Sequence, residues 1–124
     1  MTRAVMIAGV ASLALIAPAF AYVSSDGHEY ELTCNASGYI LESKHPTSRM
    51  IGRGAGTQIV RGIERLYLGK NCDAFNQAMG SGSWCWANGG FVADLENGRV
   101  GFPRQELFCP RDENEAFALD CWCE

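Results

Sequence analysis

Short stretches of alternating polar and apolar residues run through most of the chain. This two-residue period is typical of half-buried β-strands, whose side chains point in turn to the two faces of a sheet. Strands are predicted at residues 29–34, 39–41, 57–60, 63–68 and 83–87. Residues 91–95 and 99–102 flank Glu96-Asn97-Gly98, a turn sequence that predicts a β-hairpin.

Helical patterns are rare. Residues 72–79 favour one short helix, which Gly80-Ser81-Gly82 would end, and the glycines at 52, 54 and 56 predict a loop. Short strands with glycine-rich turns and one short helix indicate a mostly β fold. We therefore expect a small antiparallel barrel or sandwich.

The N-terminal residues 1–21 have the pattern of a secretion signal. Arg3 precedes an uncharged apolar stretch at 4–16, and Ala19-Phe20-Ala21 matches a cleavage site. The apolar stretch is short for a bilayer span, which leaves an uncleaved membrane anchor as the alternative. We expect residues 22–124 to form a single small domain in the periplasm or outside the cell, with no membrane span after cleavage.

All six cysteines follow the predicted signal, and their even number in a short exported chain predicts about three disulfides. In Cys121-Trp122-Cys123 the two sulfurs would lie on one face of a strand, so separate partners are expected. Spacing along the chain favours three local or end-to-end pairings: Cys109 with Cys121, Cys72 with Cys85, and Cys34 with Cys123.

Charge is unevenly distributed. The predicted mature chain has nine Lys and Arg against fourteen Asp and Glu, a net charge of −5 that argues against nucleic-acid binding. Residues 44–70 instead have six Lys and Arg against one Glu, a net charge of +5. This block either binds an anionic partner, pairs with the acidic ends of the chain, or forms a solvated surface with no partner.

Candidate binding residues combine this basic block with the tryptophans of 83–87. Trp84 and Trp86 would share one face of a strand, where they either anchor a partner or fill the core. If they are exposed, we expect one binding surface that joins them to Arg53, Arg61 or Arg65. No catalytic motif, metal-ligand pattern or cofactor motif is evident, so an enzyme is not expected.

The order of these features resembles the small periplasmic β-barrel inhibitors of animal-type lysozyme. The shared features are a strand running from Tyr30 to Cys34 followed by Gly38, a Trp strand and glycines over 84–90, a late hairpin and a closing cysteine. Six cysteines depart from that pattern, and no inhibitory residue of the family is carried over. The resemblance implies a barrel and, as an expectation, an inhibitory role.

Together these features predict a small exported binding module without enzymatic activity. One expected role is inhibition of a cell-wall hydrolase such as lysozyme. Its partner would be a protein or a cell-wall polymer of the envelope. A second hypothesis is thiol–disulfide exchange at Cys121 and Cys123. A third is a structural envelope protein with no separate ligand.

Overall fold

The computed structural model describes residues 21–52, 54–109 and 120–124. Residues 1–20 of the predicted signal, Arg53 and the acidic stretch 110–119 lie outside this part, whereas Ala21, the last residue of that signal, is described in β1. The strands are β1 (Ala21–Val23), β2 (Glu29–Asn35), β3 (Gly38–Ser43), β4 (Thr47–Ile51), β5 (Gln58–Gly62), β6 (Arg65–Gly69), β7 (Asp73–Asn76), β8 (Gly80–Ala87), β9 (Gly90–Leu95) and β10 (Gly98–Phe102). A 3₁₀ turn, Gly54–Gly56, lies between β4 and β5.

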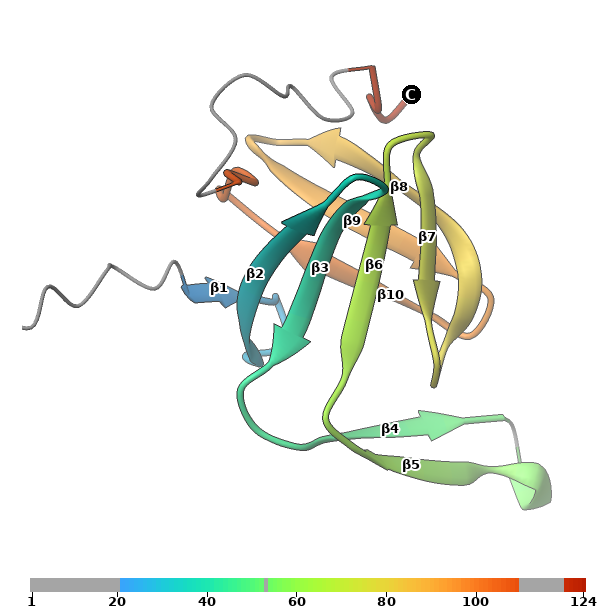
Figure 1. Ribbon diagram of the computed structural model, residues 1–124. Coiled ribbons are helices and arrows are strands. Elements are labelled where there is room, and N and C mark those ends of the chain that lie inside the picture. The colour runs from blue at the N-terminus through green and yellow to red at the C-terminus, as the bar shows by residue number, and fades with distance from the viewer. Residues whose placement is uncertain (1–20, 53, 110–119) are drawn as a thin grey trace, which may run out of the picture.

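Eight of these strands form one antiparallel sheet in the order β1-β2-β3-β6-β7-β8-β9-β10. The sheet coils into a nearly closed barrel (Figure 1). The expected mostly β barrel class is confirmed. The two predicted strands on either side of Asn97 are β9 and β10, paired from Leu95↔Gly98 to Phe91↔Phe102.

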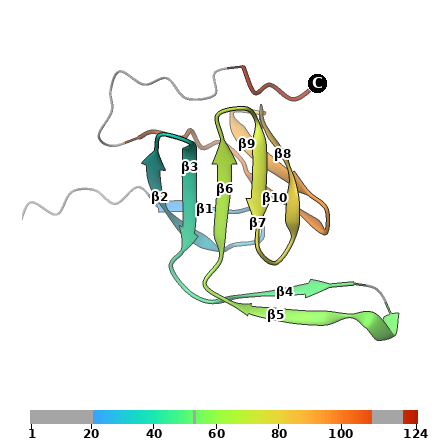
Figure 2. The same ribbon diagram turned by 45° about the vertical axis from the view of Figure 1, so that its right-hand side comes forward.

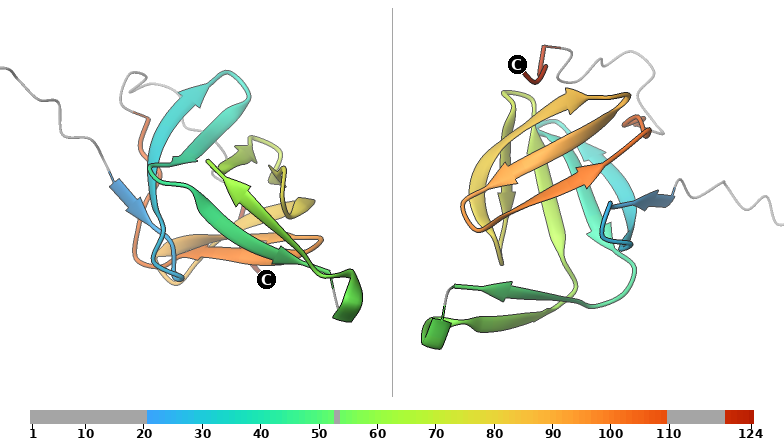
Figure 3. Two further views of the ribbon diagram at one scale, coloured as in Figure 1. Left: turned by 90° about the horizontal axis from the view of Figure 1, so that it is seen from below. Right: turned by 180° about the vertical axis from the view of Figure 1, so that it is seen from behind.

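The seam between β1 and β10 closes partly through a side chain. Ser25 N donates to Gly101 O at 2.8 Å. Beyond that point the Gln105 amide accepts from Val23 N at 2.8 Å and donates to Val23 O at 2.7 Å. The Gln105 side chain thus bonds the backbone of Val23 as a neighbouring strand would. Figure 3 shows β1 lying beside the end of β10.

Aromatic rings fill the barrel interior. Phe91 and Phe102 stack with their ring centroids 4.6 Å apart, and Tyr30 packs edge-on against Phe102 at 5.3 Å. Trp84 is 1% exposed, and its indole Nε1 donates to Gly69 O at 2.8 Å. The indole is therefore buried with its polar atom satisfied.

Three disulfides are present, as expected, but all three predicted pairings are wrong. The pairs are Cys34–Cys109, Cys72–Cys121 and Cys85–Cys123. The predicted Cys72–Cys85 pair is not formed because the β7–β8 register pairs Asp73 with Ser83. In this register Cys72 lies opposite residue 84 and not opposite Cys85. The expectation of separate partners for Cys121 and Cys123 is confirmed.

The C-terminal residues lie beside the end of β8, where β7 no longer covers it. Trp86 N donates to Cys121 O at 2.6 Å, and Cys123 N donates to Trp86 O at 3.1 Å. This short parallel bridge between Trp86 and Trp122 places Cys121 and Cys123 next to their partners on the barrel. The two disulfides thus fix the chain end to the β7–β8 region.

The predicted helix at 72–79 is wrong, since β7 occupies this segment. Its burial alternates, with Ala74 and Asn76 inside and Asp73 and Phe75 outside. Cys72 has a φ of +66°, which a continuing helix does not allow. Phe75 faces out and Asn76 faces in, so the usual placement of apolar and polar residues is inverted at the end of this strand.

β4 and β5 form a separate two-stranded hairpin that is inserted between β3 and β6. The hairpin projects away from the barrel, as the views in Figures 1 and 2 show. The predicted loop at Gly52, Gly54 and Gly56 is its tip. All five residues of β5 are exposed, unlike the strands of the barrel.

We expect the Gln105→Ala substitution to open the seam beside Val23. Two hydrogen bonds are lost, at about 1 kcal/mol net each, so the free energy of unfolding should fall by about 1 to 2 kcal/mol. Urea denaturation at neutral pH measures this change. Gln58→Ala, at an exposed position on β5, is the control and should change little. Equal stabilities for both variants would show that Gln105 does not close the barrel.

Candidate functional site

The hairpin has two distinct faces because side chains alternate along each strand. The β4–β5 register pairs Ser48 with Arg61 and Met50 with Ile59, which places these four residues on one face. We call them the outer hairpin face. Met50 is 73% exposed and Ile59 is 70% exposed. Two large apolar side chains thus lie side by side in solvent, next to a guanidinium group.

The opposite hairpin face carries a buried polar cluster at the junction with the barrel. Its centre is the carboxylate of Glu64, a residue only 6% exposed that lies between β5 and β6. The carboxylate accepts hydrogen bonds from Tyr30 Oη at 2.6 Å, Asn76 Nδ2 at 2.6 Å, Arg49 Nη2 at 3.0 Å, Arg49 Nε at 3.2 Å and Thr47 Oγ1 at 3.4 Å. We call these five residues the Glu64 cluster.

The Glu64 cluster joins elements that are distant in the sequence. Tyr30 comes from β2, Arg49 and Thr47 from β4, and Asn76 from β7. Arg49 also donates through Nη1 to Asp26 Oδ2 at 2.7 Å. A buried carboxylate without these donors would be strongly unfavourable, so the cluster holds the hairpin to the barrel.

Burial and the Glu64 charge shift the titration of the neighbouring groups. Burial raises the pKa of Tyr30, and the hydrogen bond and charge of Glu64 raise that pKa further. Burial alone would lower the pKa of Arg49, but the hydrogen bond and charge of Glu64 outweigh it and raise that pKa. Burial acts to raise the pKa of Asp26, yet Ser24 and Arg49 bring it below its ordinary value. Arg49 therefore remains charged across the accessible pH range.

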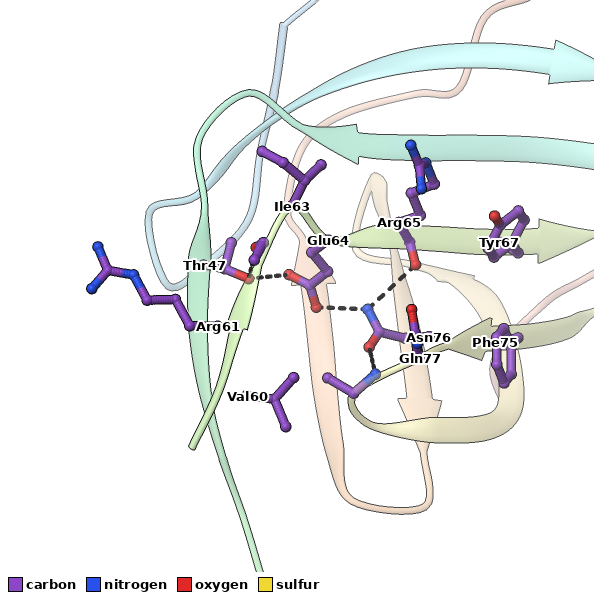
Figure 4. A pocket seen from close by; sticks show the side chains of 12 residues that line it. Thr47, Val60, Arg61, Ile63, Glu64, Arg65, Tyr67, Phe75, Asn76 and Gln77 are labelled. Carbon is purple, nitrogen blue, oxygen red and sulfur yellow. Dashed lines mark hydrogen bonds between the residues drawn. The ribbon is translucent and has the colours of Figure 1, made fainter. Parts of the chain in front are cut away.

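A hollow of about 670 Å³ lies between the hairpin and the outer surface of β6 and β7. Val60 and Ile63 line it on the hairpin side, and Tyr67 and Phe75 line it on the barrel side. The ring centroids of Tyr67 and Phe75 lie 6.1 Å apart. Figure 4 shows Val60 pointing to this side of β5, while the Arg61 side chain points away from it.

Only part of the sequence-predicted surface lies together. Arg61 is exposed on the outer hairpin face, whereas Arg65 lies on the barrel and donates through Nε to Glu42 Oε2 at 2.8 Å. Trp84 is a core residue and is not available to a partner. Trp86 is half-buried and packs against Trp84, with ring centroids 5.2 Å apart. Arg53 lies outside the described residues.

Much of the basic block pairs within the molecule. Lys44 lies 4.0 Å from Glu29, Arg49 contacts Asp26, and Arg65 contacts Glu42. These three acids lie at the acidic N-terminal end of the predicted mature chain, so at least three of the six cations pair within the molecule. No ion pair involving Arg61 is found among the described residues, which leaves its charge to the solvent.

The other sequence-derived chemistry is not assembled in the described part of the chain. Cys121 and Cys123 are each bonded to a barrel cysteine, so they do not form a dithiol pair with each other. Among residues 21–52, 54–109 and 120–124, no three His, Cys, Asp or Glu side chains gather as metal ligands. In that same part, no helix is long and apolar enough to span a membrane.

Sequence reasoning missed the residues that distinguish this region. Met50 and Ile59 carry the apolar character expected of core strands, and nothing local shows that the hairpin leaves the barrel. Glu64 is the single acid of the basic block at residues 44–70, for which the sequence predicts only a net positive charge. Its isolation among cations is the sequence feature that marks a buried ion pair.

We expect Glu64 and Arg49 to be strongly coupled in stability. Glu64→Leu leaves the Arg49 charge poorly compensated and should lower the free energy of unfolding by about 3 to 5 kcal/mol. The double variant with Arg49→Met should lose much less than the sum of the two single losses, as measured by urea denaturation. The exposed pair Glu42 and Arg65 is the control, with a coupling of at most about 1 kcal/mol. Additive losses at Glu64 and Arg49 would rule out the pair as the junction.

Alkaline pH should also weaken the junction. The pKa of Tyr30 lies above its ordinary value of 10.0 in the folded state. Its contribution to stability is therefore complete below pH 10 and is lost as the pH rises above that value. We expect the Tyr30→Phe variant to lose less free energy of unfolding than wild type between neutral pH and pH values above 10. Parallel pH profiles of the two proteins would contradict this assignment.

The comparisons with known proteins leave this geometry as the basis for any functional argument. A scan against models of protein families, a search of curated proteins and a search of solved structures each return no match. The resemblance to lysozyme inhibitors therefore stays a prediction from the sequence.

Proposed function

We propose that the protein is an exported binding module without enzymatic activity, and that its outer hairpin face docks on another protein. The observation that carries this proposal is the exposed Met50–Ile59 pair on a hairpin fixed by the Glu64 cluster. Exposed apolar side chains that lie together, bordered by Arg, are the residue types that anchor protein interfaces.

The charge of the hairpin indicates the chemistry of the partner. Residues 47–63 contain three Arg and no Asp or Glu, whereas the predicted mature chain as a whole is acidic. Arg49 is neutralised by its acidic neighbours, but Arg61 lies on the outer hairpin face. A partner surface with carboxylates around an apolar depression complements this face, and opposite charges also favour the encounter.

The buried junction supports binding by holding the hairpin in place before the partner arrives. A hairpin of two strands is at best marginally stable alone. The Glu64 cluster anchors its base to β2 and β7, so less conformational freedom is lost when the face becomes buried.

A cell-wall hydrolase is the partner class that fits this chemistry best. Most glycosidases place a pair of carboxylates on either side of the bond that they cleave. A narrow projecting hairpin with Arg61 beside Met50 and Ile59 is suited to enter such an acidic cleft. Inhibition would follow from exclusion of the glycan, with no reaction on the module itself.

The proposed location is the periplasm or the outside of the cell. Three disulfides are consistent with an oxidising compartment, because cytosolic thiols are kept reduced. The signal at residues 1–21 would deliver the chain there. Partner and module would then share one compartment with the cell wall.

The experiment measures lysis of cell walls by an animal-type lysozyme in the presence of the oxidised protein, residues 22–124. We expect saturable inhibition that Ile59→Ala and Arg61→Glu each weaken by about tenfold or more, the size of an interface anchor. Trp122→Ala, matched in exposure at 71%, and Arg99→Glu on β10 are the controls and should inhibit like wild type.

Two further results decide between parts of the proposal. Absence of inhibition would exclude this hydrolase as the partner, and capture from an envelope extract on the immobilised protein would then test the module itself. The proposed function would be overturned if the immobilised protein captures nothing that free module displaces and that the Ile59→Ala variant fails to bind. If Trp122→Ala abolishes partner capture and Ile59→Ala does not, the binding surface lies at the C-terminal end of the chain.

A further inference from the structure

The edge of β5 that faces away from β4 is an open backbone edge. In the described part of the chain, β4 and β5 pair only with each other. All five residues of β5 are exposed, and the strand contains the β-branched Ile59 and Val60 with no proline. Unpaired N–H and C=O groups along such an edge form a template for another strand.

The hollow borders β5 on the side to which Val60 points. β3 leads into β4, and β5 leads into β6, which pairs with β7 on its far side. β7 ends at Asn76, so the position beside β5 is where β7 would continue if it were longer. The residues that line the hollow come mainly from β5, β6 and the region of Phe75 to Ala78, which agrees with this placement (Figure 4).

We propose that an extended segment of the partner protein adds to the open edge of β5 as a third strand of the hairpin. The inference rests on the proposed function and specifies how the partner is held. Backbone hydrogen bonds along the edge would give affinity, and the two faces of the hairpin would select the side chains.

The two faces define the sequence of the bound segment. Side chains on one face of the added strand lie beside Val60 and enter the hollow with Tyr67 and Phe75, so these residues are apolar. Side chains on the other face lie beside Ile59 and Arg61. No acid of the hairpin neutralises Arg61, so these residues are acidic. The partner segment therefore alternates apolar and acidic residues.

The experiment uses synthetic peptides of alternating Val and Glu, labelled with a fluorophore, and measures anisotropy with the oxidised protein. A peptide of alternating Val and Lys tests the charge of the second face. We expect the Val–Glu peptide to bind about tenfold or more tightly than the Val–Lys peptide, and Arg61→Glu to reverse this order. Arg99→Glu, on β10, is the matched control and should preserve it.

Backbone methylation tests the strand geometry directly. Successive N–H groups of a strand point to opposite edges, so methylation of every Glu nitrogen blocks one edge and methylation of every Val nitrogen blocks the other. One methylated peptide should lose binding by about tenfold or more, and the other should bind like the parent.

The outcomes separate this inference from the proposed function. Equal binding of both methylated peptides, or no binding of the Val–Glu peptide, would overturn strand addition. A dimer of the free protein that forms through β5 would overturn it as well, because a second copy would then cover the edge. In each case, inhibition or partner capture that depends on Ile59 would still support the proposed function.

Discussion

The buried carboxylate of Glu64 is the interaction on which the arrangement of this protein depends. A charge removed from solvent must be met by donors, and here they come from β2, β4 and β7. Only one placement of the hairpin relative to the barrel brings Tyr30, Arg49 and Asn76 around the same carboxylate. The free-energy gain of such a pair over apolar residues is small, but the geometry that it selects is specific.

The barrel and the hairpin are stabilised by different means. Inside the barrel, packed aromatic and aliphatic side chains form the apolar core, and three disulfides restrict the unfolded chain. The hairpin has almost no apolar core, because Met50 and Ile59 face the solvent. It depends on its junction with the barrel, which frees its outer face and the β5 edge for contacts with other molecules.

Local alternation was sufficient to predict the barrel class and most of its strands. It failed at β7, where Asn76 faces inward to donate a hydrogen bond to the buried Glu64 carboxylate, so that Phe75 faces outward. The cysteine pairings also failed, because spacing along the chain carries no information on the parallel bridge between Trp86 and Trp122. The sequence-based binding surface was incomplete for a related reason. Trp84 fills the barrel, whereas the exposed apolar residues lie on strands that resemble core strands until their partners are known.

The turn residues show the same limit. Asn-Gly at 97–98 predicted a hairpin, and β9 and β10 do form one, yet neither residue has a positive φ. The Asn88-Gly89 pair does, with φ values of +54° and +73°, and it joins β8 to β9 in the way that two-residue hairpin turns prefer. A turn motif therefore located a hairpin without fixing its backbone conformation.

The most direct test of this account is the backbone dynamics of the free protein, measured by ¹⁵N relaxation. If the Glu64 cluster fixes the hairpin to the barrel, amides of β4 and β5 near the junction should have order parameters of about 0.85, as in the barrel strands. Order parameters below about 0.6 across both hairpin strands, with a rigid barrel, would contradict the account. The hairpin would then be a loosely attached segment, and its outer face would not be held ready for a partner.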